Sequence, residues 1–231
     1  MSAITTELPV ASVHRAARRK HARPGELLSA ALDLFVEKGY AATRVEEVAR
    51  RAGVSKGTLF LYFPSKEDLF KAVVRENLSL RFPQWSMVLD QFPGTSAELL
   101  RHAMGQWWSL VGDTKASGIS KLMMSEASNF PELAAFYQHE VLEPGNALIR
   151  RILQRGIERG EFRPIDLQYG VHTVLAPMLY LVVWKHSFGA CIPQGTPLVP
   201  EKYLAAQVDI LLNGLCANEV DNLKRSRTPT P

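Results

Sequence analysis

Four consecutive residues with short polar or basic side chains, Ser55, Lys56, Gly57 and Thr58, form the stretch of this chain best suited to specific chemistry. Hydroxyl and ammonium groups donate hydrogen bonds to the base edges and phosphate oxygens of a DNA duplex, and glycine lets a backbone come close to such a partner. The run follows Gly53, a residue type that supplies the left-handed backbone of a sharp turn. The pattern therefore predicts recognition of duplex DNA through hydrogen bonds.

Two short helices joined by a turn are the elements that present such residues to DNA. Thr43 and Glu46 have the spacing of a capping box, which predicts the start of the first helix just ahead of the turn glycine. Ser55 is placed to cap the second helix, in which Leu59 falls on the inward face before Pro64 ends the helix. The segment therefore reads as a helix-turn-helix.

Residues around the motif are placed to hold the sugar–phosphate backbone. Thr43, Tyr62 and Lys66 offer hydroxyl, ammonium and helix-dipole contacts at helix ends or on the outer surface. A generic helical hairpin shares the glycine turn and would be the better interpretation if the turn stood alone. The proline stop, the two capping boxes and a basic segment ahead of the motif favour DNA binding.

The net charge of +4 lies entirely in the first third of the chain. Residues 1–80 hold 13 lysines and arginines against 9 acidic residues, whereas residues 81–231 hold 14 of each. Within that third, residues 14–23 (HRAARRKHAR) carry five basic side chains and two histidines without an acid. Such a run is usually a solvated tail, but its position predicts that residues 1–23 form a flexible basic arm that contacts phosphates or the minor groove.

Helical periodicity continues along the chain, and no segment alternates apolar and polar residues convincingly as a strand. We therefore predict an all-α fold: a three-helix DNA-binding domain over 24–70, a linking helix, and a helical effector-binding and dimerisation domain over 71–218. Residues 219–231 are too polar to pack and should form a disordered tail. In the second domain the predicted helices are 97–111, 117–128, 131–142, 144–159, 166–188 and 201–216.

Aromatic and methionine side chains are dense in the second domain. At helical spacing such residues are more often core than ligand contacts, and that is the default for any one of them. Two adjacent tryptophans and a methionine pair would nevertheless make an adaptable apolar cavity. Pro177 should kink its helix and open space beside Trp108. The predicted effector-pocket residues are Met104, Trp107, Trp108, Met123, Phe136, Tyr137, Met178, Tyr180 and Trp184.

The last two predicted helices are candidates for a subunit interface. The helix over 166–188 is apolar on nearly every side and must be covered on both flanks, whereas the helix over 201–216 has a narrower apolar stripe. With their copies in a second subunit the two could form a four-helix bundle; alternatively, they complete the core of the monomer. The predicted interface residues are Leu204, Val208, Leu211, Leu212 and Leu215.

Residues 24–75, with LLSAALDLFVEKGYAATRVEEVARRAGVS followed by KGTLFLYFPSKEDLF, resemble the N-terminal domain of TetR-family transcriptional regulators almost without gaps. The resemblance implies a homodimer whose recognition helices enter successive major grooves of a near-palindromic operator, roughly 34–36 Å apart. It also implies repression that is relieved by a small molecule in the second domain. With a helix-turn-helix over 44–63, the predicted DNA-binding residues are Thr43, Arg44, Ser55, Lys56, Gly57, Thr58, Phe60, Tyr62 and Lys66.

Phe60 departs from the family pattern, which commonly has tyrosine at this place with a hydroxyl that reaches a phosphate. Phenylalanine lacks that hydroxyl, so we expect the recognition helix to seat there by packing alone. In the second domain, the resemblance and the apolar composition together predict a hydrophobic or aromatic effector. A regulator without a small-molecule inducer, constitutive or controlled by a partner, is the alternative.

An enzyme is the main alternative of another class. The six histidines show no HExxH or other metal-ligand spacing, and no GxSxG, P-loop or GxGxxG pattern occurs. His172 and His186 would lie about 21 Å apart along one helix, too far to share a metal ion. We therefore expect no catalytic residues, no metal and no cofactor.

The sequence also predicts a cytoplasmic protein that does not enter a membrane. It contains no uninterrupted run of 18 apolar residues, and its start, MSAITTELPV, lacks the basic and apolar segments of a secretion signal. Cys191 and Cys216 do not form a CxxC pair, so a disulfide framework or zinc ribbon is disfavoured.

Overall fold

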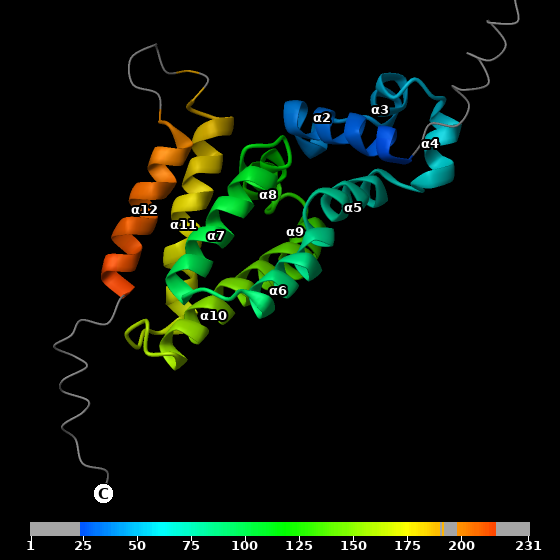
Figure 1. Ribbon diagram of the computed structural model, residues 1–231. Helices are drawn as coiled ribbons and strands as arrows, with labels where there is room; N and C mark the ends of the chain where they lie inside the picture. Colours follow the sequence, from blue (N-terminus) through cyan, green and yellow to red (C-terminus); the bar gives the residue numbers. More distant parts are fainter. Residues whose placement is uncertain (1–23, 190, 192–197, 216–231) are drawn as a thin grey trace, which may run out of the picture. The chain divides into compact units, whose positions relative to one another are not determined.

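The computed structural model describes residues 24–189, 191 and 198–215, and within them every regular element is a helix, which confirms the all-α class (Figure 1). The predicted arm over 1–23 and tail over 219–231 lie outside the described residues. In chain order the elements are α2 (Pro24–Ala42), α3 (Val45–Arg51), α4 (Lys56–Tyr62), α5 (Lys66–Asn77), η1 (Ser79–Arg81), α6 (Phe82–Gln91), α7 (Ser96–Trp107), η2 (Trp108–Gly112), α8 (Ser117–Glu126), α9 (Pro131–Tyr137), η3 (Gln138–Leu142), α10 (Glu143–Glu158), α11 (Leu167–His186) and α12 (Pro200–Leu215).

The chain divides into two compact units, of which the first ends at Val73 and the second begins at Val74. The boundary falls inside α5, three residues after the predicted division between residues 70 and 71. Unit 1 therefore consists of α2, α3, α4 and most of α5, and unit 2 holds the remaining helices.

The core of unit 1 is built around three packed rings. Phe35 and Tyr40 from α2 lie 5.7 Å apart between centroids, and Phe70 from α5 packs edge-on against them at 5.2 and 5.3 Å. Val48 from α3 and Leu59 from α4 are fully buried. Because aromatic pairs contribute about 0.5–1.5 kcal/mol each beyond the area they bury, this cluster fixes the frame that carries the short helices α3 and α4.

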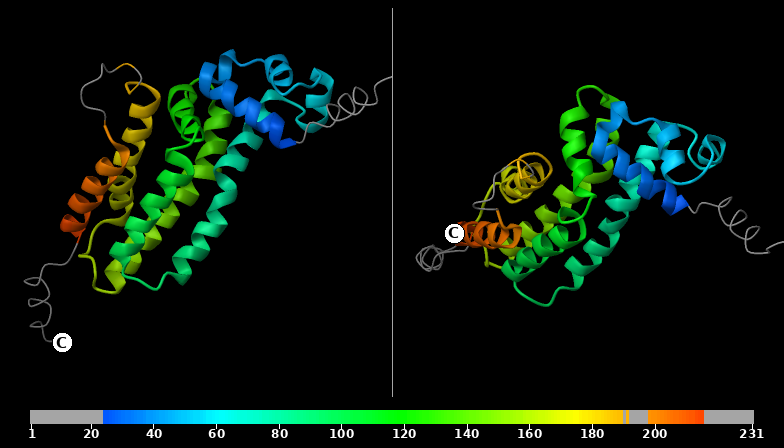
Figure 2. Two further views of the ribbon diagram at one scale, coloured as in Figure 1. Left: turned by 45° about the horizontal axis from the view of Figure 1, so that its top comes forward. Right: turned by 90° about the horizontal axis from the view of Figure 1, so that it is seen from above.

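Unit 2 is a helical bundle centred on α10 and α11. α10 packs against α6, α7 and α11, whereas α11 also contacts α8 and α12. α11 and α12 run side by side in the views of Figures 1 and 2, and α12 also reaches α7. The buried core of this unit contains Leu89, Leu99, Leu100, Met104, Trp108, Ile149, Ile152, Leu153, Phe162, Val171, Val174, Met178, Leu181, Leu204, Val208 and Leu212.

The long apolar helix α11 begins as predicted at a capping aspartate. The carboxylate of Asp166 accepts hydrogen bonds from the backbone N–H groups of Gln168 and Tyr169, at 2.8 and 3.4 Å. The helix then runs unbroken to His186 with Pro177 inside it. Among the described residues, α11 is the one helix long and apolar enough to cross a membrane by length and composition, a test that the core helix of a soluble protein also passes.

Four elements of unit 2 were not predicted: the 3-10 helix η1, the helix α6 and the two π-helical turns η2 and η3. The position of η3 has a local cause. Pro144 lies in the first turn of α10, so it has no N–H for the carbonyl of Glu140, and its ring would clash with that carbonyl in a regular α-helix. The chain widens to a π turn there, and the helices predicted over 131–142 and 144–159 follow each other without a break.

Candidate nucleic-acid interface and ligand cavity

The turn that orients α4 depends on one left-handed glycine. Gly53 has φ +72°, and a Cβ at this position would meet nothing within 4 Å, so the requirement is conformational rather than spatial. The N–H of Val54 donates to Ala49 at 2.9 Å, which closes the turn onto α3. The predicted cap is confirmed, because Ser55 Oγ accepts from the backbone N–H of Thr58 at 3.0 Å. The turn and cap together fix where α4 begins.

The outer face of α4 is open, as expected for a recognition helix. Ser55, Lys56 and Gly57 are exposed, whereas Leu59 points into the core of unit 1, as predicted. The exposed face also carries Leu61, whose side chain is 85% exposed. Leu61 was not among the predicted DNA contacts, although a large apolar side chain on a reading face can contact a thymine methyl group.

The ammonium of Lys56 is held by a neighbouring carboxylate. Its Nζ lies 2.5 Å from Glu46 Oε1 and 5.6 Å from the ring centroid of Phe60. The hydrogen bond from Lys56 is the largest cause that lowers the pKa of Glu46. Both side chains are exposed, so the pair is screened by solvent, and a phosphate can replace the carboxylate.

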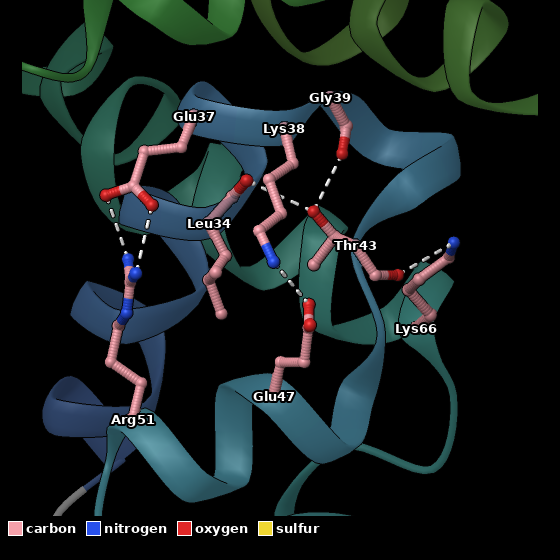
Figure 3. A network of polar contacts seen from close by, with 8 residues as sticks. All are labelled: Leu34, Glu37, Lys38, Gly39, Thr43, Glu47, Arg51 and Lys66. Carbon is pink, nitrogen blue, oxygen red and sulfur yellow. Dashed lines mark hydrogen bonds and ion pairs between the residues drawn. The ribbon is translucent and has the colours of Figure 1, made fainter.

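Thr43 neither caps α3 nor exposes its hydroxyl to a phosphate, although the sequence had predicted both roles. Arg44 is the N-cap residue of α3 and makes no side-chain capping bond, so the expected capping box with Glu46 is absent. The hydroxyl of Thr43 instead donates to the carbonyls of Leu34 and Gly39, at 3.1 and 2.7 Å (Figure 3). Only 2% of this residue is exposed, so its hydroxyl is not on the surface where a phosphate could reach it. The prediction of a phosphate contact through this hydroxyl was wrong.

Lys66 has a set of partners that the sequence did not suggest. Its Nζ donates to the carbonyls of Tyr40, Ala41 and Thr43, at 2.9, 3.3 and 3.2 Å, and lies 4.4 Å from the Tyr40 ring centroid. Figure 3 shows the bond to Thr43. An ammonium has three hydrogens, so these carbonyls satisfy it in the free protein. Lys66 therefore joins the start of α5 to the last turn of α2 and to Thr43.

Two ion pairs brace α2 against α3 (Figure 3). Arg51 forms a bidentate pair with Glu37, with both N···O distances 2.9 Å, and Lys38 contacts Glu47 at 2.9 Å. The planar guanidinium fits a carboxylate in one orientation, so the Arg51 pair also fixes the angle between the helices. These contacts hold the support behind α4.

The remaining predicted DNA contacts are exposed or at the surface of unit 1. Arg44 is exposed at the start of α3, and Phe60 and Tyr62 lie on the exposed side of α4. The basic run over 14–23 lies outside the described residues. Together with Ser55, Lys56 and Gly57, these exposed side chains are the candidate DNA contacts of unit 1, and Arg44 and Lys56 supply positive charge among them.

Unit 2 contains a partly open cavity of about 210 Å³ between α6, α7, α8, the α9–α10 junction and α11. Its wall is mostly apolar. The lining residues are Leu78, Phe82, Gln84, Trp85, Val88, Leu89, Leu99, His102, Ala103, Met104, Gln106, Trp107, Leu110, Val111, Ser120, Tyr137, Val141, Leu142, Gly145, Asn146, Leu148, Ile149, Ile152, Leu175, Met178 and Leu179. Apolar walls with a few polar groups are characteristic of small-molecule sites.

Four of the nine predicted pocket residues line the cavity: Met104, Trp107, Tyr137 and Met178. The other five do not. Trp108 and Met123 are buried in packed regions, and Tyr180 is 53% exposed and lies against Tyr203. Phe136 lies under the guanidinium of Arg75, and Trp184 packs close to Gly189. Trp108 does not border the cavity, so the expected space beside it near Pro177 is not found.

The wall contributed by α6 was missed because this helix was not predicted. It supplies Phe82, Trp85, Val88 and Leu89 to the cavity. A proline at its second position and two neighbouring aromatic residues were the available signals of a helix start with an apolar face.

A buried pair of hydroxyls provides polar atoms in the cavity wall. Ser120 Oγ and the Tyr137 hydroxyl lie 2.9 Å apart, and both residues are buried. Burial raises the pKa of Tyr137 to about 12, although the hydrogen bond with Ser120 acts in the opposite direction. The phenol therefore keeps its hydrogen at neutral pH.

Both π turns border the cavity. Leu110 and Val111 of η2 and Val141 and Leu142 of η3 are lining residues. Widened turns of this kind occur frequently at functional sites. The turn η3 also carries Glu140, which links the cavity wall to another helix.

The link runs from η3 to the end of α5. Arg75 Nη2 and Nε contact Glu140 Oε1 at 2.8 and 3.2 Å, and the guanidinium lies 5.1 Å from the ring centroid of Phe136. The hydrogen bond from Arg75 is the largest cause that lowers the pKa of Glu140. Tyr137 lines the cavity and directly follows Phe136 in the chain. A movement of the cavity wall at Tyr137 would therefore act on the residue next to the contact between Phe136 and Arg75.

The predicted dimer stripe on α12 is largely part of the monomer core. Leu204, Val208 and Leu212 are buried in unit 2, and Leu211 packs against the same core. Leu204, Val208 and Leu212 therefore complete the monomer core and are not available as subunit contacts, whereas the assignment of Leu211 and Leu215 to an interface stays a prediction. Leu215 is the last residue of the helix.

A capped and exposed recognition helix behind a left-handed glycine, together with a separate helical unit that contains an apolar cavity, defines a helix-turn-helix transcriptional regulator with a ligand-binding unit. The chain belongs to the TetR family of bacterial regulatory proteins. The model of that family's DNA-binding domain matches residues 27–73, and that of a tetracyclin repressor-like C-terminal domain matches residues 94–188, which together exceed half of the chain.

Individual relatives are regulators of the same kind. The chain is 28% identical over 204 residues to the HTH-type transcriptional repressor KstR2 of Mycolicibacterium smegmatis, a match that covers 86% of this chain and 93% of that repressor. It is 44% identical over 75 residues to the HTH-type transcriptional regulator RutR of Escherichia coli K12, but this match covers only 32% of this chain and 35% of RutR.

Solved structures show the same fold. The regulator FadR from Bacillus subtilis, solved in complex with stearoyl-CoA, has a TM-score of 0.65 at 20% identity and covers 83% of this chain and 99% of its own. The ketosteroid transcriptional regulator KstR2 of Mycobacterium tuberculosis has a TM-score of 0.63 at 23% identity, with coverage of 86% and 97%. At these identities the likeness concerns the fold alone.

Proposed function

We propose that this protein is a cytoplasmic transcriptional repressor, a homodimer that binds a near-palindromic operator and releases it when a small apolar effector enters the cavity of unit 2. The observation that carries this proposal is the presence, on one chain, of an exposed recognition helix and an apolar cavity. Family membership and the repressor relative support the same assignment.

The DNA side of the proposal rests on the exposed face of α4. Ser55 and Lys56 would donate hydrogen bonds to base edges or phosphates, and Gly57, which has open space where a Cβ would be, would allow close approach of the backbone. Arg44 and Tyr62 would contact phosphates beside the groove, and Lys66 would act indirectly by holding α5. Because Thr43 is buried, only its backbone could take part.

A second copy of the chain is the expected partner, because one short helix reads too little sequence. A mismatched base pair costs only about 1–3 kcal/mol, so selectivity in a genome requires two readers. The outward faces of α11 and α12 would form the interface, because Leu204, Val208 and Leu212 on the inward face of α12 are buried in the monomer core. Ala176 on α11 and Ala206 on α12 are exposed there, and Ile210 is 73% exposed.

The effector would act through η3. Ligand contact with Val141 and Leu142 would shift this π turn, and the Glu140–Arg75 pair would pass the shift to α5. At its other end α5 is tied through Lys66 to the last turn of α2 and to Thr43. Switching from 1:99 to 99:1 requires about 5.5 kcal/mol of differential ligand affinity between the two states.

A regulator without an inducer is the second candidate. It would leave the cavity and the two π turns that border it without a role, so the ligand-responsive repressor is preferred. A screen of small molecules by tryptophan fluorescence separates the two candidates, because Trp85 and Trp107 line the cavity. A bound effector should quench or shift their emission, and silence across a broad screen would favour the second candidate.

The proposed function is tested by selection of bound sequences from random DNA with the full chain, followed by titration of the selected duplex. We expect an inverted repeat, two chains per site, and an affinity that falls steeply with salt, with a slope near 0.9 for each phosphate contacted. Enrichment of no sequence, or of a single asymmetric half-site bound by one chain, would contradict the proposal.

A further inference from the structure

The hydroxyl pair in the cavity wall has one hydrogen to spare. Ser120 and Tyr137 carry one hydroxyl hydrogen each, and their mutual hydrogen bond of 2.9 Å uses one of the two. Within the part of the chain that the structure describes, neither hydroxyl makes a second hydrogen bond. Both residues line the cavity and are more than nine-tenths buried. Because a buried donor without a partner is unfavourable, the site is suited to an acceptor atom that enters the cavity.

The rest of the wall limits what can carry that acceptor. None of the described residues that line the cavity is Asp, Glu, Lys or Arg. The other polar lining side chains are Gln84, His102, Gln106 and Asn146, of which the first three are exposed at the edge of the cavity. An ionised group buried beside Ser120 would therefore lose its hydration and gain no opposite charge.

We propose that the cavity binds an uncharged apolar molecule whose carbonyl oxygen accepts the spare hydrogen of the Ser120–Tyr137 pair. This inference deepens the proposed function and depends on it for its biological role. The cavity volume of about 210 Å³ exceeds the ~150 Å³ of an engineered cavity that holds benzene, so a ring system larger than benzene fits. Trp85, Trp107 and Phe82 offer aromatic faces to such a ring.

Three probes with one bicyclic skeleton test the inference: 1-tetralone, which has the carbonyl; tetralin, which lacks it; and 1,2,3,4-tetrahydro-1-naphthoate, which is ionised. Their binding to the full-length protein is measured by calorimetry without DNA. The double variant Ser120→Ala/Tyr137→Phe removes both hydroxyls and leaves no unpaired partner. We expect it to weaken 1-tetralone about three- to tenfold, as for a neutral hydrogen bond, and to change tetralin less than about twofold. The naphthoate should bind more weakly than the ketone to the wild type.

A matched control removes the same groups outside the cavity. Ser125 on α8 and Tyr180 on α11 are exposed and do not line the cavity, so Ser125→Ala/Tyr180→Phe should leave all three affinities unchanged. Circular dichroism and urea unfolding verify that both double variants fold.

Equal weakening of 1-tetralone and tetralin would assign the pair a packing role only and overturn the inference. Unchanged ketone affinity, tighter binding of the naphthoate, or no binding of any probe would also overturn it. The binding assay contains no DNA, so it stands apart from the proposed function. If the ketone binds through the Ser120–Tyr137 pair but does not release the operator, the proposed function alone is contradicted. If an effector releases the operator equally well from the wild type and the double variant, this inference alone is contradicted.

Discussion

Replacement of Thr43 by valine separates a structural role from a DNA-contacting role for this residue. Valine keeps the branched shape and removes the hydroxyl, which donates to the carbonyls of Leu34 and Gly39 from a site that is 2% exposed. Loss of a buried hydrogen bond that leaves its partner unsatisfied costs about 1–3 kcal/mol. We therefore expect Thr43→Val to lower the free energy of unfolding by about 1–3 kcal/mol, and to leave the operator affinity of the folded protein unchanged.

Urea unfolding measured at one protein concentration gives the stability, and anisotropy of a labelled operator at low temperature gives the affinity. Thr173→Val is the control for stability, because the Thr173 hydroxyl also donates to a carbonyl, at 2.8 Å, in a bond that is only partly buried and on a residue that is exposed. It should change stability by no more than about 0.5 kcal/mol. If the Thr43 hydroxyl held a phosphate, Thr43→Val would reduce operator affinity at unchanged stability, and that result would refute the reasoning.

Three further predictions concern charge, reading and coupling. Glu46→Gln frees Lys56 and removes a negative charge beside α4, so operator affinity should rise and its salt dependence steepen in a salt titration; weaker binding would count against the Lys56 role. Uracil lacks the methyl group of thymine, so its substitution in the operator should weaken binding by the wild type if Leu61 contacts that methyl group. Leu61→Ala should then bind the thymine and uracil operators equally well. If the variant still prefers thymine to the same extent, Leu61 does not contact the methyl group. Arg75→Met should preserve operator binding but raise the effector concentration needed for release, whereas normal release would exclude the pair as the link. Because Arg75 lowers the pKa of Glu140, the pair is complete above the ordinary carboxyl pKa and is lost only as pH falls through the lowered value, so the effect of Arg75→Met on release should be the same at about pH 6 and pH 8.

Local signals were sufficient for the reading helix. The left-handed turn at Gly53, the cap at Ser55 and the inward side chain of Leu59 each depend on residues a few positions away, so the sequence predicts them correctly. The predicted capping role of Thr43 was wrong because the spacing of a capping box carries no information about hydrogen-bond acceptors in another helix. The carbonyl of Leu34, nine residues earlier, competes successfully for the hydroxyl. Lys66 engages carbonyls more than twenty residues away in the same manner.

Tertiary packing decided the features that periodicity left open. An apolar stripe such as Leu204, Val208 and Leu212 suits either a partner or the chain's own core, and the structure assigns it to the core. Met104, Trp107, Tyr137 and Met178 were correctly predicted to line a cavity because aromatic and methionine residues are dense in this unit. Tyr180 was misplaced because α11 is apolar on nearly every side, so its composition does not indicate which face borders a cavity.

The proposed DNA binding requires that the exposed start of α4 enters the major groove, and Gly57→Glu tests this claim directly. A Cβ at Gly57 meets only Ser55 Oγ at 3.8 Å, so the variant should fold while it places a carboxylate on the reading face. Gly105→Glu adds the same group to an exposed helical glycine with nothing within 4 Å of its Cβ. Titration of the selected operator should show binding lost for Gly57→Glu and retained for Gly105→Glu; full affinity in a folded Gly57→Glu protein would contradict the claim.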